Sequence, residues 1–227
     1  KKSEKIENLP KYKEGYWWIQ DYSSMMPIFL INNLKSKKVL DMCAAPGGKT
    51  FQLLNNGSEV LSYEKNEKKI KIIKKNLKRL KMQNKIINKD SLLINSKNKF
   101  DVVVLDAPCS AIGTIRRNPE ILFRNKSPNF AKITSFQYKL LNKAKELIHN
   151  KGIVIYMVCS FLDIECENQI EKFLNENKNF IKKKFNSNEK NLSKLINDKG
   201  YFKTLPVRLN NKFLIDGFFA VQLERND

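Results

Sequence analysis

The sequence predicts an α/β domain built on a doubly wound, mostly parallel sheet with an antiparallel closing strand. Three observations favour this fold. Short apolar runs alternate with amphipathic segments along the chain, which is typical of β-α units. The run "FDVVVL" (residues 100–105) is continuously apolar after Asp101, as in a strand buried on both faces. The 227 residues, 41% of them hydrophobic, are enough for one large core.

The remaining elements follow from periodicity and turn residues. Short apolar runs mark parallel strands at 39–42, 60–63, 86–88 and 153–158, and an aromatic-rich run after Asp216-Gly217 predicts one or two closing strands between 213 and 223. Helices are expected from Thr50 and over 67–82. A third apolar stripe runs from Ile133 to Leu147, with His149 at the helix end and Gly152 in the following turn. The polar stretch 175–191 predicts a surface loop or weak helix.

Polar residues cluster where the predicted strands end. Five β-α units with right-handed crossovers would bring those ends to one edge of the sheet, which is where such sheets bind ligands. The residues expected along that edge are Cys43, Glu64, Asp90, Asp106, Cys109 and Cys159.

The first of these loops, "VLDMCAAPGGKT", ends like a phosphate-binding P-loop. In a P-loop the first glycine lets the backbone wrap the phosphates, but Cys43 stands there, and Pro46 lacks a backbone N–H donor. A P-loop-like NTPase is therefore disfavoured. A nucleoside cofactor without a polyphosphate fits better, and S-adenosylmethionine (AdoMet) is the candidate. Glu64, at the next strand end, is expected to accept hydrogen bonds from its ribose.

Net charge and composition indicate which class of partner the protein binds. The chain carries 43 Lys+Arg against 23 Asp+Glu, a net charge of +20, which favours RNA over a membrane. Compositional bias is an alternative source of this charge, since Lys, Asn and Ile are all abundant. Arg116 and Arg117 follow a candidate active loop and are expected to contact RNA phosphates. No apolar run approaches a membrane span, so we expect a cytoplasmic protein without a membrane partner.

Cysteine and histidine usage restricts the chemistry. No two of the four cysteines have zinc-binding spacing, so no metal is expected, and the single histidine, His149, excludes a Ser-His-Asp triad. Cys109 in "DAPCSAIGTIRRNPEI" and Cys159 in "YMVCS" would leave adjacent strands and share a pocket with Asp106. Methylation of cytosine carbon-5 needs a nucleophile at carbon-6, which a thiolate can supply. A protonated Asp106 could bond ring nitrogen-3. The residues alone leave open which thiol attacks.

These segments, together with "GYWWIQDYSS", "SFQYKLLNKAKELI", "VCSFLDIECEN" and "DGFFAVQL" in the same order, resemble the bacterial Fmu/Sun (RsmB-like) family of RNA 5-methylcytosine methyltransferases. The resemblance implies a Rossmann-like class I AdoMet-dependent domain acting as a monomer on RNA, with 16S ribosomal RNA of the small subunit as the expected target. It implies Cys159 as the nucleophile and Cys109 as the residue for product release. The implied cofactor residues are Cys43, Ala44, Ala45, Pro46, Gly47, Gly48, Lys49, Glu64, Asp90 and Asp106.

The chain departs from the family pattern in three places. Val158 precedes Cys159 where threonine is usual, and Glu64 replaces the commoner aspartate. Only residues 1–24 precede the expected catalytic domain, 25–227, and they are expected to be the edge of an RNA-binding region. A non-catalytic RNA-binding ribosome-assembly factor that keeps the fold is the second alternative, which the retained thiols and Asp106 disfavour.

Overall fold

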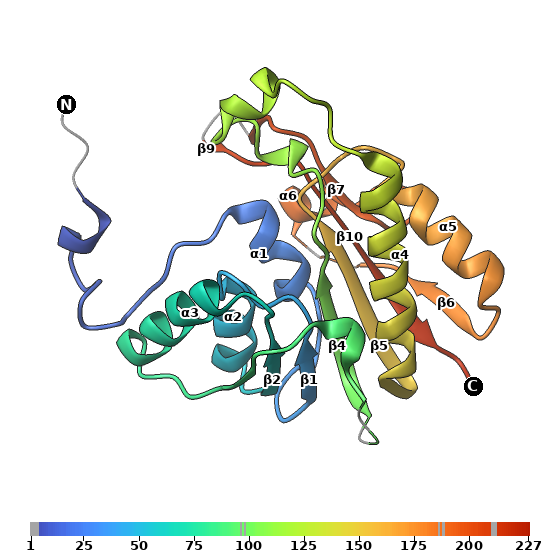
Figure 1. Ribbon diagram of the computed structural model, residues 1–227, viewed down its shortest axis with the longest axis horizontal. Coiled ribbons are helices and arrows are strands. Elements are labelled where there is room, and N and C mark those ends of the chain that lie inside the picture. Colours follow the sequence, from blue (N-terminus) through green and yellow to red (C-terminus); the bar gives the residue numbers. More distant parts are fainter. Residues whose placement is uncertain (1–4, 96, 98, 186, 188, 210–212) are drawn as a thin grey trace.

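The computed structural model describes residues 5–227 apart from 96, 98, 186, 188 and 210–212. Five parallel strands form the first part of its main sheet, in the order β3-β2-β1-β4-β5. Figure 1 shows the sheet with helices on both faces. The parallel strands are β1 (Lys38–Asp41), β2 (Glu59–Tyr63), β3 (Lys85–Ile87), β4 (Phe100–Asp106) and β5 (Ile148–Val158).

The carboxyl-terminal part closes the sheet with antiparallel strands. β10 pairs with β5 on one side and with β6 and β7 on the other. A separate hairpin, β8 and β9, precedes β10. The bounds are β6 (Phe180–Lys183), β7 (Phe202–Thr204), β8 (Arg208–Leu209), β9 (Phe213–Leu214) and β10 (Phe218–Arg225). The expected closing strands are confirmed.

The central strand β4 shows why helices cover both faces of the sheet. Val103 and Leu105 pack into the core that includes α4 and α5, whereas Val102 and Val104 pack into the core beneath α1, α2 and α6. All four are buried, so the strand needs apolar residues at every position. The helices are α1 (Tyr22–Phe29), α2 (Gly48–Asn55), α3 (Glu67–Arg79), α4 (Phe130–Glu146), α5 (Glu167–Glu176) and α6 (Lys190–Ser193).

The structure corrects three expectations. The crossing from β3 to β4 contains only a 3₁₀ turn, η2 (Ser91–Leu93), and not an α-helix. The stretch 175–191 contains β6, because Phe180 is buried and the strand completes the edge beside β10. His149 is not at a helix end: it lies, exposed, in β5.

The last correction extends to Gly152, which also lies in β5 and not in a turn. α4 ends before Leu147, and the pairing of β4 with β5 then shifts between Phe100↔Ile148 and Val102↔Ile153. This irregularity absorbs extra residues in one strand, as a β-bulge does. A Cβ at Gly152 would lie 3.0 Å from the His149 carbonyl oxygen, so the bulge has little space for a side chain.

The segment that precedes α1 packs against α3. The guanidinium of Arg79 donates to the carbonyl oxygens of Tyr12 and Trp17, at 2.8 and 2.9 Å, and lies 3.9 Å from the centre of the Tyr12 ring. A 3₁₀ turn, η1 (Ile6–Asn8), precedes this contact. α1 begins at Tyr22, so the expected boundary after residue 24 falls inside a helix. Among the described residues, no helix has the length and apolar character needed to cross a bilayer.

Candidate active site at the carboxyl edge of the sheet

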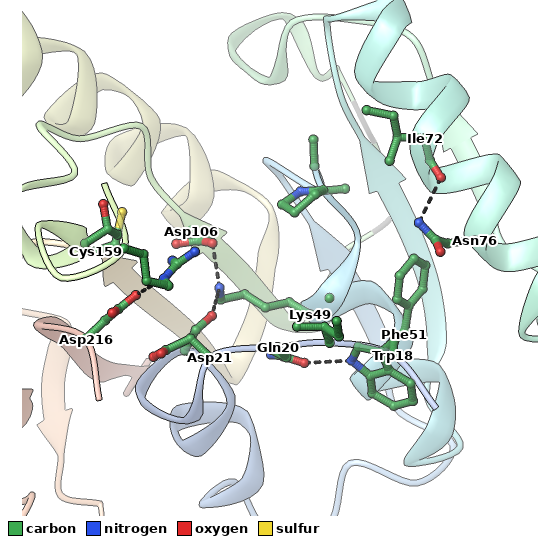
Figure 2. Close-up of a pocket in the computed structure, with 18 of the residues that line it drawn as sticks. Trp18, Gln20, Asp21, Lys49, Phe51, Ile72, Asn76, Asp106, Cys159 and Asp216 are labelled. Carbon is green, nitrogen blue, oxygen red and sulfur yellow. Dashed lines mark hydrogen bonds and ion pairs between the residues drawn. The ribbon is translucent and has the colours of Figure 1, made fainter. Parts of the chain in front are cut away.

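Two cavities meet at the carboxyl ends of the parallel strands. The smaller, of about 260 Å³, is lined by Glu64, Asp90 and Cys109 among others. The larger, of about 610 Å³, is lined by residues that include Lys49 and Asp216 and is shown in Figure 2. Cys43, Ala45, Asp106 and Cys159 line both. The structure therefore brings the expected thiols and carboxylates together, as the strand order requires.

The loop between β1 and α2 separates the two cavities. The Ala45 N–H donates to Glu64 Oε2 at 3.3 Å, and the Ala44 N–H donates to the Tyr63 carbonyl at 3.1 Å. Gly47 has φ 111°, and a Cβ there would lie 2.4 Å from the Phe51 ring. Only glycine fits this position without strain. Pro46, Gly48 and Lys49 line the larger cavity and not the smaller one.

Asp41, at the end of β1, contacts α2 on the far side of this loop. Sequence reasoning did not identify it as part of the site. Its carboxylate accepts a 2.6 Å hydrogen bond from Thr50 Oγ1 and has its other oxygen buried without a hydrogen-bond partner among the described residues. Burial is the main cause that raises the pKa of Asp41 to about 6. The only sequence signal was its place at the end of the first strand.

Two carboxylates border the smaller cavity. Glu64 accepts hydrogen bonds from the N–H groups of Ala45 and Asn66, which fixes its side chain at the tip of β2. Asp90 accepts from the Leu92 N–H at 3.0 Å and lies 3.5 Å from Lys65 Nζ. These backbone donors hold both carboxylates in place beside the cavity. The arrangement is suited to a ligand that carries hydroxyls or positive charge.

Asp106 and Lys49 form an ion pair where the cavities meet. Lys49 Nζ lies 2.6 Å from Asp106 Oδ2 and also donates to Ser24 Oγ at 2.8 Å. Both side chains are largely buried, at 9% and 25% exposure for Lys49 and Asp106. The ion pair places an ammonium beside the carboxylate, and contact of Asp106 with ring nitrogen-3 of a cytosine stays a prediction. The contact of Ser24 with Lys49 had no signal in the sequence.

The two thiols are adjacent. Cys109 Sγ and Cys159 Sγ lie 3.2 Å apart, and both cysteines are free and half-buried. A hydrogen bond from the Cys109 thiol is the main cause that lowers the pKa of Cys159, and Lys49 lowers it further. The same hydrogen bond, followed by burial, raises the pKa of Cys109 well above its usual value. The pair therefore favours a thiolate at Cys159 and a protonated Cys109.

Arg116 and Arg117 share one buried carboxylate. Asp216, 2% exposed, lies 2.9 Å from an Arg116 nitrogen and 2.6 Å from Arg117 Nε, and Arg116 also lies 3.3 Å from Asp21. These ion pairs join the loop after Cys109 to the turn before β10. Sequence reasoning assigned Asp216 to a turn and missed its partners. Contact of the two arginines with RNA phosphates stays a prediction, and Arg117, at 49% exposure, is the more accessible.

The matching family model is described as 16S rRNA methyltransferase RsmB/F and covers residues 28–224. The chain belongs to this family. Curated relatives include "Ribosomal RNA small subunit methyltransferase B" of Photorhabdus laumondii, 34% identical over 73% of this chain, and that of Citrobacter koseri, 34% identical over 74%. The chain spans about two fifths of their lengths, 40% and 41%.

Solved structures share the fold. A methyltransferase homologue from Pyrococcus horikoshii has a TM-score of 0.78 and 26% identity, over 97% of this chain and 72% of its own. NSun6 from the same organism, solved with SFG, has a TM-score of 0.83 and 23% identity, over 99% of this chain and 57% of its own. The RsmB/F chain therefore has the Rossmann-like class I methyltransferase fold that its sequence predicted.

Proposed function

We propose that this chain is the catalytic domain of an AdoMet-dependent RNA methyltransferase that modifies cytosine carbon-5, with small-subunit ribosomal RNA as its substrate. The observation that carries the proposal is the pair of thiols, 3.2 Å apart, at the junction of two cavities. The chemistry needs one thiolate to attack carbon-6, and a second thiol beside it can assist release. The names of the family and of its curated relatives support ribosomal RNA as the substrate.

The smaller cavity is the proposed AdoMet site. The loop at Cys43 and Pro46 lacks the glycine and one backbone donor of a phosphate cradle, and Glu64 and Asp90 would repel a triphosphate. The same carboxylates suit ribose hydroxyls and a cationic sulfonium. AdoMet would supply an activated methyl group there. SFG, the ligand of the NSun6 structure, is an AdoMet analogue and supports this assignment.

The larger cavity is the proposed cytosine site. Cys159 lines this cavity together with the Asp106–Lys49 pair. Addition of the Cys159 thiolate to carbon-6 forms a C–S bond and moves an electron pair onto ring nitrogen-3 and the adjoining carbonyl. The Lys49 ammonium can donate a hydrogen bond to that region, and Asp106 can do so in its protonated form. After the methyl group reaches carbon-5, the carbon-5 proton passes to water in a step that Cys109 assists. The electron pair of the C–H bond restores the double bond between carbon-5 and carbon-6, and the C–S bond breaks to return the thiolate of Cys159.

The proposal is tested by assaying methyl transfer with the full-length protein. Small-subunit ribosomal RNA that lacks its modifications is incubated with AdoMet and then sequenced after bisulfite treatment. We expect one or a few cytosines to become resistant to conversion, in the native protein and not in Cys159→Ala. Methylation at another atom, or binding of ATP with no use of AdoMet, would contradict the proposal. RNA binding without methyl transfer would point to an assembly factor.

A further inference from the structure

One buried carboxylate, outside both cavities, contacts the loops that carry the two thiols. Glu165 lies in the turn before α5 and is fully buried. Its Oε2 accepts hydrogen bonds from Ser110 Oγ at 2.6 Å and from Ser160 Oγ at 2.7 Å. Ser110 directly follows Cys109 and Ser160 directly follows Cys159. A single carboxylate oxygen thus joins the residues next to both thiols.

Two further donors complete the contacts of Glu165. Its Oε1 accepts from the Ser110 N–H at 2.8 Å and from Gln137 Nε2 at 3.1 Å. Gln137, on α4, also donates to the carbonyl oxygen of Pro108 at 3.0 Å, so both neighbours of Cys109 are held. Within the described part of the chain, Glu165 has no ion pair, and four N–H and O–H groups surround a carboxylate that can only accept.

The proposed chemistry requires the two sulfurs to reach neighbouring ring atoms of one cytosine. Cys109 and Cys159 are 50 residues apart in sequence and lie on loops after different strands, so contacts between these loops must set their separation. Besides Glu165, the Gly113 N–H donates to the Cys159 carbonyl at 3.0 Å. Glu165 is the side chain that contacts the residues following both cysteines.

We propose that Glu165 is a positioning residue that sets the distance between the two thiols. It acts through Ser110 and Ser160 and does not touch the base or AdoMet. The inference rests on the proposed function, because it takes both thiols to act on one cytosine. It also makes a claim about geometry that can be measured without activity.

Glu165→Gln is the most informative change, because the side chain keeps its size. The amide replaces one acceptor oxygen with an N–H₂ group, which would face either the two serine hydroxyls or the Ser110 and Gln137 N–H donors. Beside the Ser110 and Gln137 N–H donors the amide N–H₂ has no acceptor, and beside the serines it can bond only if both hydroxyls turn from donor to acceptor. The native set of four hydrogen bonds is lost in either case. Since small misplacements of reacting groups cost large factors in rate, kcat should fall about 10- to 100-fold while the KM for RNA and for AdoMet stays near native.

Glu167→Gln is the matched control. Glu167 lies two residues further on, is also largely buried, and accepts from Lys203 Nζ at 2.8 Å. Its carboxylate contacts Lys203 and does not contact Ser110 or Ser160. It should leave kcat and the separation of the thiols unchanged. Ser160→Ala is the second test variant, since it removes one of the four donors and should lower kcat about fivefold, a loss of ~1 kcal/mol for one hydrogen bond.

The separation of the thiols is measured with phenylarsine oxide, which bridges two adjacent thiols and releases one water. The full-length native protein should bind it through Cys109 and Cys159, and Cys109→Ser should abolish this binding. Glu165→Gln should weaken it at least about tenfold, as expected when two groups lose their fixed proximity. Thermal unfolding and AdoMet titration of the same variants report whether the fold and the cofactor site persist.

The outcomes separate the two claims. A fall in kcat and in arsenical affinity for Glu165→Gln and Ser160→Ala, with near-native unfolding and AdoMet binding, supports the positioning role. Native values of both in Glu165→Gln overturn it. An equal loss of stability and AdoMet binding also overturns it, because Glu165 would then be a general structural residue. If the native protein binds the arsenical but methylates no cytosine, the proposed function is wrong. The effect of Glu165→Gln on arsenical affinity then still decides whether Glu165 sets the distance between the thiols.

Discussion

The two cavities at the carboxyl edge differ in how their charged groups are compensated. In the smaller cavity, backbone N–H groups hold the carboxylates of Glu64 and Asp90, and the nearest cation to Asp90, Lys65, is mostly exposed. In the larger cavity, Lys49 is paired with Asp106 and Arg117 with Asp216, each at 2.6 Å. The carboxylates of the smaller cavity are thus held mainly by backbone donors, although Lys65 and Lys69 also line it, whereas those of the larger cavity are held by ion pairs.

Under the proposed function, each cavity would take a different kind of ligand. A fixed pair of carboxylates attracts ribose hydroxyls and a sulfonium cation without prior rearrangement. A polyanion at the larger cavity must instead compete with Asp106 and Asp216 for the cations. Under the proposed function, the smaller cavity would be the AdoMet side and the larger cavity the RNA side, and the following changes test that assignment.

Lys49→Met should have the largest effect on catalysis. The substitution keeps the side-chain stem but removes the ammonium that neutralises Asp106 and faces the larger cavity. Loss of such a preorganised donor costs about 10²- to 10³-fold, so kcat/KM for RNA should fall by that factor. AdoMet affinity, measured by calorimetry, should stay near native. A matched Lys65→Ala change, at the smaller cavity, should spare kcat, and the reverse pattern would exchange the two cavities.

The buried carboxylate of Asp41 has no cation in contact with it among the described residues, and burial raises its pKa. Its pKa is raised to about 6, above the usual 3.8, so the folded protein binds more protons than the unfolded chain between these values. Stability should therefore fall as pH rises from about 4 to 6, by roughly 2 to 3 kcal/mol in all. Asp41→Asn should remove this fall in urea unfolding measurements. The exposed Asp198→Asn should keep it, and an unchanged slope in Asp41→Asn would contradict the assignment.

Glu64→Ala should weaken AdoMet and its demethylated product about 10- to 30-fold, because hydrogen bonds from ribose to a charged acceptor are lost. We expect micromolar affinity for the native protein. Glu64→Asp should lose less, since it keeps the carboxylate on a shorter arm. RNA affinity in the absence of AdoMet serves as the control and should not change. Equal AdoMet affinities for Glu64→Ala and native protein would remove the smaller cavity as the cofactor site.

Arg117→Ala should have the smallest effect. Arg117 is half-exposed but already paired with Asp216, so its contact with an RNA phosphate replaces one anion by another. The slope of log affinity against log salt should flatten by at most about one unit. Arg116→Ala should change it less, because Arg116 is less exposed and has two carboxylate partners. A slope unchanged in both variants would make the arginines purely structural.

Most of the fold could be predicted from the sequence, because the periodicity of apolar residues reflects which positions are buried. β4 was recognisable since Val102 to Leu105 are all buried, and the strand ends located the thiols and Glu64 at one edge. β6 was missed, because a short edge strand rich in lysine has the composition of a loop. The extent of β5 was missed as well, since its irregular pairing with β4 interrupts the expected strand pattern near Gly152.

The partners of the site residues could not be predicted in the same way. Glu165, Asp216 and Ser24 reach the site through contacts across the fold, such as the Arg117–Asp216 pair, which spans 99 residues. Local patterns carry no information on such distances.

The central claim is that Cys159 attacks the base and Cys109 assists release, and trapping of the covalent intermediate tests it most directly. Full-length Cys109→Ala and Cys159→Ala proteins are incubated with labelled RNA and AdoMet and separated on a denaturing gel. Cys109→Ala should accumulate a denaturant-resistant protein–RNA adduct, because the C–S bond forms before release. Cys159→Ala should form no adduct and transfer no methyl group. An adduct in Cys159→Ala and none in Cys109→Ala would contradict the account and exchange the roles of the thiols.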